Sequence, residues 1–131
     1  MAYDNSLTVV GNLTRDPELR YTAGGVPVAE FGLAWNRRDK DGNDITSFFE
    51  VTCWRDLAEH AAESLSKGCR AIVYGHIELD TWETPDGDKR SKVKVVADEV
   101  GPSLKWATAA VTKIPASGTS TPPYPTGHEP F

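Results

Sequence analysis

The stretch 47–54 alternates between two kinds of side chain with a period of two, which is the period of a β-strand. One face of this strand holds apolar side chains that suit a core: Phe49, Val51 and Cys53. The other face holds Phe48, Glu50, Thr52 and Trp54, so an aromatic ring stands at each end of a row that should otherwise be polar. The chain must therefore fold so that one face of this strand is buried and the other face uses its rings.

The two rings at positions 48 and 54 would lie about 20 Å apart, because a strand rises by about 3.3 Å per residue. Rings at that spacing form a platform on a sheet face. Unpaired nucleic-acid bases stack on such platforms, at about 1–3 kcal/mol per base. The alternative is that a helix or a second subunit covers the rings, since buried aromatic residues are common. This strand alone leaves both interpretations open.

One helical pattern lies among several strand patterns. Apolar residues at helical spacing predict a helix over 56–66. Strands are predicted over 7–13, with a bend or bulge at Gly11, over 26–35, 47–54 and 70–77, with a short extended piece at 19–22. A hairpin is predicted from 78–84 and 89–96 around an Asp-Gly turn, and the sheet should continue through Glu99, Val100 and Leu104 to Trp106.

Five main strands with one helix after the third predict an all-β fold with a small helical part. The arrangement is that of the OB-fold, a five-stranded Greek-key barrel, here with a long hairpin between the fourth and fifth strands. Residues 1–112 would form this domain. Residues 113–131 would form a disordered tail rich in Pro, Ser, Thr and Gly, because five of the nine prolines fall within the last 17 residues.

Charge and composition exclude several classes of protein. The net charge is −5, which opposes nucleic-acid binding at long range, but the basic residues gather in a loop at 37–40 and in the stretch 89–94. No apolar run is long enough for a membrane span and no signal peptide is expected, so we expect a cytoplasmic protein. Cys53 and Cys69 are expected to be thiols, although a bridge within or between subunits stays open. The three histidines have no ligand spacing, so neither a metal nor another cofactor is expected.

Two further tryptophans are candidates for the same platform. Trp82 alternates with Asp80 and Thr84 and should face outward. By parity Trp35 should lie with Phe31 in the core, but a bulge would move it to the open face, and the sequence does not decide between these.

Several motifs resemble bacterial single-stranded DNA-binding proteins, over roughly residues 5–112. The opening Val10-Gly11-Asn12-Leu13-Thr14-Arg15-Asp16-Pro17-Glu18-Leu19-Arg20-Tyr21-Thr22 is similar to the family's first signature. Further similarity lies in Gly25-Val26-Pro27-Val28-Ala29, in Trp54-Arg55-Asp56-Leu57-Ala58-Glu59 and in the stretch from Lys67-Gly68 to Gly75. Asp98-Glu99-Val100-Gly101-Pro102-Ser103-Leu104 resembles the actinobacterial branch.

The resemblance implies sequence-independent binding and protection of single-stranded DNA, in replication, recombination and repair, by a homotetramer that is no enzyme and works at the nucleoid. It places stacking rings at Phe48, Trp54 and Trp82, with Trp35 as the nearest candidate for a fourth. It matches phosphate-contacting bases at Arg20 and Arg55. Further bases lie in the corresponding regions: Arg37, Arg38, Lys89, Arg90, Lys92 and Lys94. Actinobacterial tetramers also suggest a swapped C-terminal strand over about 102–113.

The C-terminal tip departs from the family pattern. The family usually ends in several acids before Pro-Phe, a tip that docks replication and repair enzymes, whereas here only Glu129 precedes Pro130 and Phe131. Recruitment of partner proteins is therefore expected to be weak or absent, as in a specialised second copy or a phage-borne version. Two rival functions are a small nuclease, which would need clustered carboxylates on a metal, and an adaptor whose rings face protein.

Overall fold

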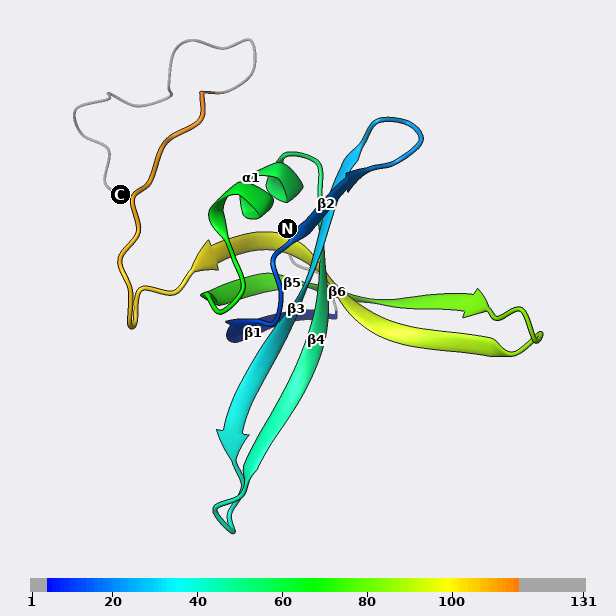
Figure 1. Ribbon diagram of the computed structural model, residues 1–131, viewed down its shortest axis with the longest axis horizontal. Coiled ribbons are helices and arrows are strands. Elements are labelled where there is room, and N and C mark those ends of the chain that lie inside the picture. The colour runs from blue at the N-terminus through cyan, green and yellow to red at the C-terminus, as the bar shows by residue number, and fades with distance from the viewer. Residues whose placement is uncertain (1–4, 116–131) are drawn as a thin grey trace.

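Two long hairpins build most of the sheet. β3 (Pro27–Arg38) pairs antiparallel with β4 (Asp44–Trp54), and β5 (Arg70–Glu83) pairs antiparallel with β6 (Lys89–Pro102). In the computed structural model, which describes residues 5–115, the two hairpins leave a common base in different directions and form two projecting arms (Figure 1). The base of the hairpins is therefore the place where a barrel can close.

Three shorter pairings close the barrel. β1 (Ser6–Leu13) pairs with β5 along its length and with β3 at its end, where Asn12 faces Ala34. β4 pairs in parallel with β6 at Val51 and Val95, and β2 (Glu18–Tyr21) lies against β3. The strand order β1-β5-β6-β4-β3-β2, returning from β1 to β3, gives the predicted OB-fold, with the short extended piece as an additional strand.

The core fills the inside of the barrel with the inward rows of the strands. Its buried members include Val9, Leu13, Phe31, Leu33, Val51, Cys53, Val73 and Val95. α1 (Asp56–Ser64) adds Ala58 and Ala61 to this core. The helix ends two residues earlier than predicted, because Leu65 adopts an extended backbone and still places its side chain in the core.

Of the bend or bulge predicted at Gly11, the bulge is wrong, while the bend stays a prediction. β1 pairs with β5 without interruption from Ser6 to Asn12. The glycine is needed for another reason: a Cβ at this position would lie 2.5 Å from the carbonyl oxygen of Ala34, so only glycine lets β3 approach β1. The irregularity in the sheet falls instead between Tyr74 and Gly75 of β5.

The β3–β4 arm is longer than the sequence predicted. Much of the expected loop 36–46 is strand, because Asp39 closes a tight turn by accepting hydrogen bonds from the backbone amides of Asp41 and Asn43, at 2.9 and 2.8 Å. These bonds, that of Asn43 first, lower the pKa of Asp39.

The prediction that the sheet continues to Trp106 is wrong. β6 ends at Pro102, opposite Ala71, because β5 offers no partner beyond its first residue, Arg70. Residues 103–115 then run without a helix or strand, and Leu104 and Trp106 are exposed. The boundary predicted at residue 112 falls in this segment and stays a prediction. The tail from residue 116 on, with Pro130 and Phe131, lies outside the described residues.

Candidate nucleic-acid interface

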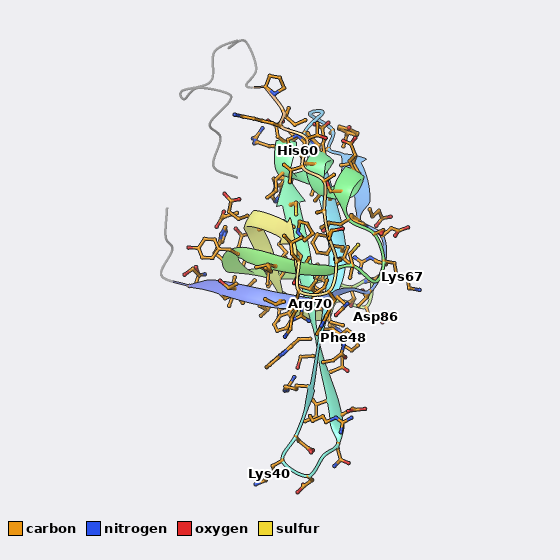
Figure 2. The ribbon with its side chains drawn as sticks, turned by 90° about the vertical axis from the view of Figure 1, so that its left-hand side faces the viewer. Lys40, Phe48, His60, Lys67, Arg70 and Asp86 are labelled. Atoms are coloured by element: carbon orange, nitrogen blue, oxygen red, sulfur yellow. The ribbon has the colours of Figure 1, made fainter. Side chains whose placement is uncertain are left out.

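The outer row of β4 holds two exposed rings with a closed centre. Phe48 is 71% exposed and Trp54 is 41% exposed, as their parity predicts. Figure 2 shows Phe48 where the β3–β4 arm leaves the barrel, on the way to Lys40 at the tip of the arm. Thr52 lies between the two rings. It was expected to be solvated but is buried, because the neighbouring strands β3 and β6 flank it on both sides. The two exposed rings therefore lie at the two ends of a row whose middle is buried at Thr52.

Arg55 follows Trp54 in the chain, and Arg20 lies on the face of Trp54 two strands away. Cross-strand register places Arg20 opposite Val28 and Val28 opposite Trp54, so these three side chains share one face. Arg20 also contacts Glu30, at 3.1 Å. Cations on the same face as a ring suit a base stacked on the ring and phosphates that continue across the face.

The backbone of Arg55 is unusual. Its φ is 62°, the one positive φ among the described non-glycine residues. A residue held in such a conformation stores about 1–3 kcal/mol of strain, and such residues cluster at functional sites. The amide of Arg55 donates a 2.8 Å hydrogen bond to the carbonyl of Pro27, which holds the turn from Trp54 into α1. The strained turn fixes Arg55 immediately after the ring.

Trp82 lies on the other arm with polar residues, as predicted. It is 47% exposed, and its cross-strand neighbour on the same face is Arg90. Lys92, further along this face, reaches back to Glu50 on β4, at 3.7 Å. The face that carries Trp82 is therefore continuous with the outer row of β4. Lys94 lies on the same face, opposite Glu78, whereas Lys89 opposes Glu83 on the reverse face.

Trp35 follows neither of the two alternatives from the sequence. The pairing of β3 with β4 contains no bulge, so Trp35 keeps the parity of Phe31 and Leu33. It is nevertheless 44% exposed, because β3 has left the barrel at this point and become an arm. The ring lies over β1, in a hollow of about 360 Å³ that Phe49 also lines.

The structure separates Trp35 from Phe48. The two side chains point to opposite faces of the β3–β4 arm. The guanidinium of Arg37 lies 4.1 Å above the ring of Trp35 and donates to the hydroxyl of Ser47 at 2.8 Å. Arg38 shares the face of Phe48 and contacts Asp44 at 3.4 Å. A strand that contacted all four predicted rings would have to pass around this arm.

Sequence reasoning missed an ion-pair cluster in the middle of the outer face. Arg15 Nη2 lies 2.6 Å from Glu50 Oε2, and Lys92 Nζ lies 3.7 Å from Glu50 Oε1. The hydrogen bond to Glu50 raises the pKa of Arg15. Periodicity carries no signal for this cluster, because its three members come from three separate parts of the chain.

A second missed group surrounds Trp106. The cations of Arg70 and Lys105 lie 4.8 and 4.9 Å from the centre of its ring.

Tyr21 contacts the helix α1. Its hydroxyl donates a hydrogen bond to Glu59 at 3.1 Å, and this bond raises the pKa of Tyr21.

The two cysteines are thiols in the structure and differ in environment. Burial raises the pKa of Cys53 to about 12. Cys69 is less buried, and a hydrogen bond with Ser66 lowers its pKa. Across residues 5–115, three or more His, Cys, Asp or Glu side chains nowhere come together as a metal site would require. Within the same range, α1 is too short to cross a membrane.

An OB-fold barrel with exposed rings beside arginines and lysines defines a class of oligonucleotide-binding domains. Comparison with known proteins narrows this class. The model of the single-strand binding protein family matches residues 4–103. The chain belongs to this family.

Its relatives include named proteins of actinobacteria. The single-stranded DNA-binding protein of Mycolicibacterium smegmatis is 47% identical over 126 residues, which cover 90% of this chain and 75% of the relative. That of Mycobacterium tuberculosis strain H37Rv is 45% identical, with 90% and 76% covered. That of Corynebacterium glutamicum is 47% identical over 123 residues, with 89% and 55% covered.

Proposed function

We propose that this chain binds single-stranded DNA without sequence preference and protects it during replication, recombination and repair, as a binding protein and not as an enzyme. The observation that carries the proposal is the continuous outer face with three exposed rings: Phe48, Trp54 and Trp82. Membership of the single-strand binding protein family and the names of the relatives support it. The protein would act in the cytoplasm, at the nucleoid.

Bases would stack on the three rings while phosphates follow nearby cations. Arg20 lies on the face of Trp54 and Arg55 follows this ring in the chain, and Arg90 and Lys94 lie on the face of Trp82. Arg38 would extend this path along the arm of Phe48, and Lys92 would extend it along the other arm. Lys89 lies on the reverse face of that arm and would meet the strand only where it passes around the arm. Trp35 and Arg37 would meet the strand only where it passes to the reverse face of the β3–β4 arm. Stacking tolerates any base because every base has a π face.

We also propose that residues 1–112 assemble as a homotetramer, with residues 113–131 as the tail. Apolar side chains stay exposed in the extended segment after β6: Leu104, Trp106, Val111 and Ile114. A second copy of the chain would cover them, as the swapped strand of the resemblance implies. The tip at Pro130 and Phe131 would recruit other proteins weakly or not at all, since one acid precedes it.

Titration with a dT oligonucleotide tests the proposed function. Stacking on Trp54 and Trp82 should quench tryptophan fluorescence, and the affinity should fall as salt rises. An unchanged spectrum would favour the adaptor whose rings face protein. Magnesium-dependent loss of the oligonucleotide would favour the nuclease. Light scattering after size exclusion, with and without dT oligomers of graded length, tests the tetramer.

A further inference from the structure

Glu50 holds a carboxylate at the centre of the outer face. It stands on β4 between Phe48 and Trp54, where bound DNA would pass. Each of its two oxygens takes a different cation, Arg15 at 2.6 Å and Lys92 at 3.7 Å. Its side chain is 20% exposed, while those of Arg15 and Lys92 are 45% and 56% exposed. The two cations are therefore accessible from solvent, but a carboxylate already holds them.

The backbone is shaped to bring Arg15 to this place. Gly32 on β3 lies directly opposite Glu50. A Cβ at Gly32 would lie 3.1 Å from Arg15 Nη1 and would collide with the hydroxyl of Thr14. The amide of Thr14 also donates to the carbonyl of Gly32, at 2.9 Å. The missing side chain thus lets the segment after β1 cross β3, so that Arg15 reaches the acid on the next strand.

A similar pair stands at the end of the same face. Glu30 on β3, the strand next to that of Trp54, forms an ion pair with Arg20 at 3.1 Å. Among the residues that the structure describes, no ion pair involves Arg55 or Arg90. The cations of this face therefore fall into two groups, those held by a carboxylate and those open to a phosphate.

Carboxylate and phosphate bind arginine in the same way. The guanidinium presents a planar fork of N–H donors that fits either anion. We propose that Glu50 is an internal competitor of the DNA phosphates: its carboxylate occupies Arg15 and Lys92, so a phosphate binds there only by displacing it. This inference rests on the proposed function. Glu50 thus lowers the affinity for DNA, because fewer cations of the free protein are available to neutralise phosphates.

The salt dependence of binding measures that number. For single strands, log K falls with log salt concentration with a slope of about −0.7 for each phosphate neutralised. Glu50→Gln keeps the shape of the side chain and removes its charge. The proposal predicts that this variant has a steeper slope, by about 0.7 for each phosphate gained. The change is about 0.7 if only one of Arg15 and Lys92 responds and about 1.4 if both do. At low salt the variant should bind a dT oligonucleotide about five- to tenfold more tightly than the parent.

Glu63→Gln is the matched control. Glu63 lies exposed on α1, and its substitution changes the net charge by the same one unit. It should leave the slope of the parent unchanged. If Glu50→Gln and Glu63→Gln gave the same small gain, net charge would explain the effect and the proposal would be wrong. Weaker binding by Glu50→Gln would also contradict it, because Glu50 would then position Arg15 for DNA.

Arg15→Gln provides a test that does not depend on the folding of the first variant. If Glu50 already occupies Arg15, Arg15→Gln should keep the salt slope of the parent. When the two changes are combined, it should also remove the share of the gained slope that Arg15 contributes, which is about half if both Arg15 and Lys92 respond. A slope shallower by about 0.7 in Arg15→Gln alone would show that Arg15 binds phosphate in the parent, which would overturn the proposal.

The two proposals fail in different ways. If the parent quenches with dT and Glu50→Gln has the Kd and slope of the parent, only the role of Glu50 is refuted. If neither the parent nor a variant responds to dT, the proposed function fails and the role of Glu50 fails with it.

Discussion

The two faces of the β3–β4 ribbon carry similar apolar side chains under opposite conditions. On the inner face Phe31 and Val51 face each other across the two strands and are fully buried. On the outer face Phe48 and Trp54 are exposed to solvent. Burial of a core ring stabilises the folded protein. An exposed ring still has apolar surface that a stacked base can cover, so its burial stabilises the complex with the ligand. One ribbon thereby separates stability from binding, and substitutions should reveal this separation.

The largest effect is expected on the inner face. Phe31→Ala should lower the free energy of unfolding by about 3–5 kcal/mol, because it leaves a cavity in the packed barrel. Urea denaturation at a fixed protein concentration measures this loss. The fraction that stays folded should bind dT as the parent does. A loss below about 1 kcal/mol would mean that the two faces do not differ in this way.

On the outer face, Trp54→Ala should weaken binding of a dT oligonucleotide by about 1–3 kcal/mol. Isothermal titration calorimetry measures the affinity, and the urea midpoint of the variant should stay close to that of the parent. A variant that binds as tightly as the parent would remove Trp54 from the interface. One that unfolds early would give the ring a structural role.

Cys53, on the inner face, should make stability depend on pH. Burial raises the pKa of its thiol from 9.0 to about 12, so the folded protein keeps a proton that the unfolded chain releases above pH 9. The free energy of unfolding should therefore be highest below pH 9 and fall by about 1 kcal/mol per pH unit between pH 9 and 12. Denaturation series at these pH values test this. Cys53→Ala should flatten the decline, and an equal decline in that variant would assign it to other groups.

Arg55, next to the outer ring, should show the two properties in opposition. Glycine accepts a positive φ without strain, so Arg55→Gly should raise the free energy of unfolding by up to about 1 kcal/mol. The same change removes a proposed phosphate contact and should make the salt slope shallower by about 0.7. Thermal unfolding and salt-dependent titration of one preparation measure both. A variant with lower stability would show that the conformation at Arg55 is not strained.

Local alternation was sufficient to predict the parts of the interface that depend on one strand. The outward direction of Phe48, Trp54 and Trp82 follows from parity alone, and the structure agrees. Parity also assigned Trp35 to the core row, but it could not show that β3 leaves the barrel before Trp35. How far a strand stays within a barrel depends on its partners, which the local sequence does not contain.

Pairings between distant segments explain the other errors. β6 ends at Pro102 because β5 provides no further partner, so the expected strand through Trp106 does not form. Gly11 and Gly32 look like weak points of strands, but each makes room for a segment that crosses it. The contact of Glu50 with Arg15 and Lys92 joins three distant segments in the same way.

The two seams of the barrel are short compared with its arms. β1 meets β3 only at Asn12 and Leu13, and β4 meets β6 only at Val51 and Thr52. Beyond these seams the strands of each arm pair only with each other (Figure 1), and the ion pair between Lys92 and Glu50, at 3.7 Å, links the β5–β6 arm to β4. The spacing between Phe48 on one arm and Trp82 on the other is therefore set by the few pairings at which the two hairpins join the barrel.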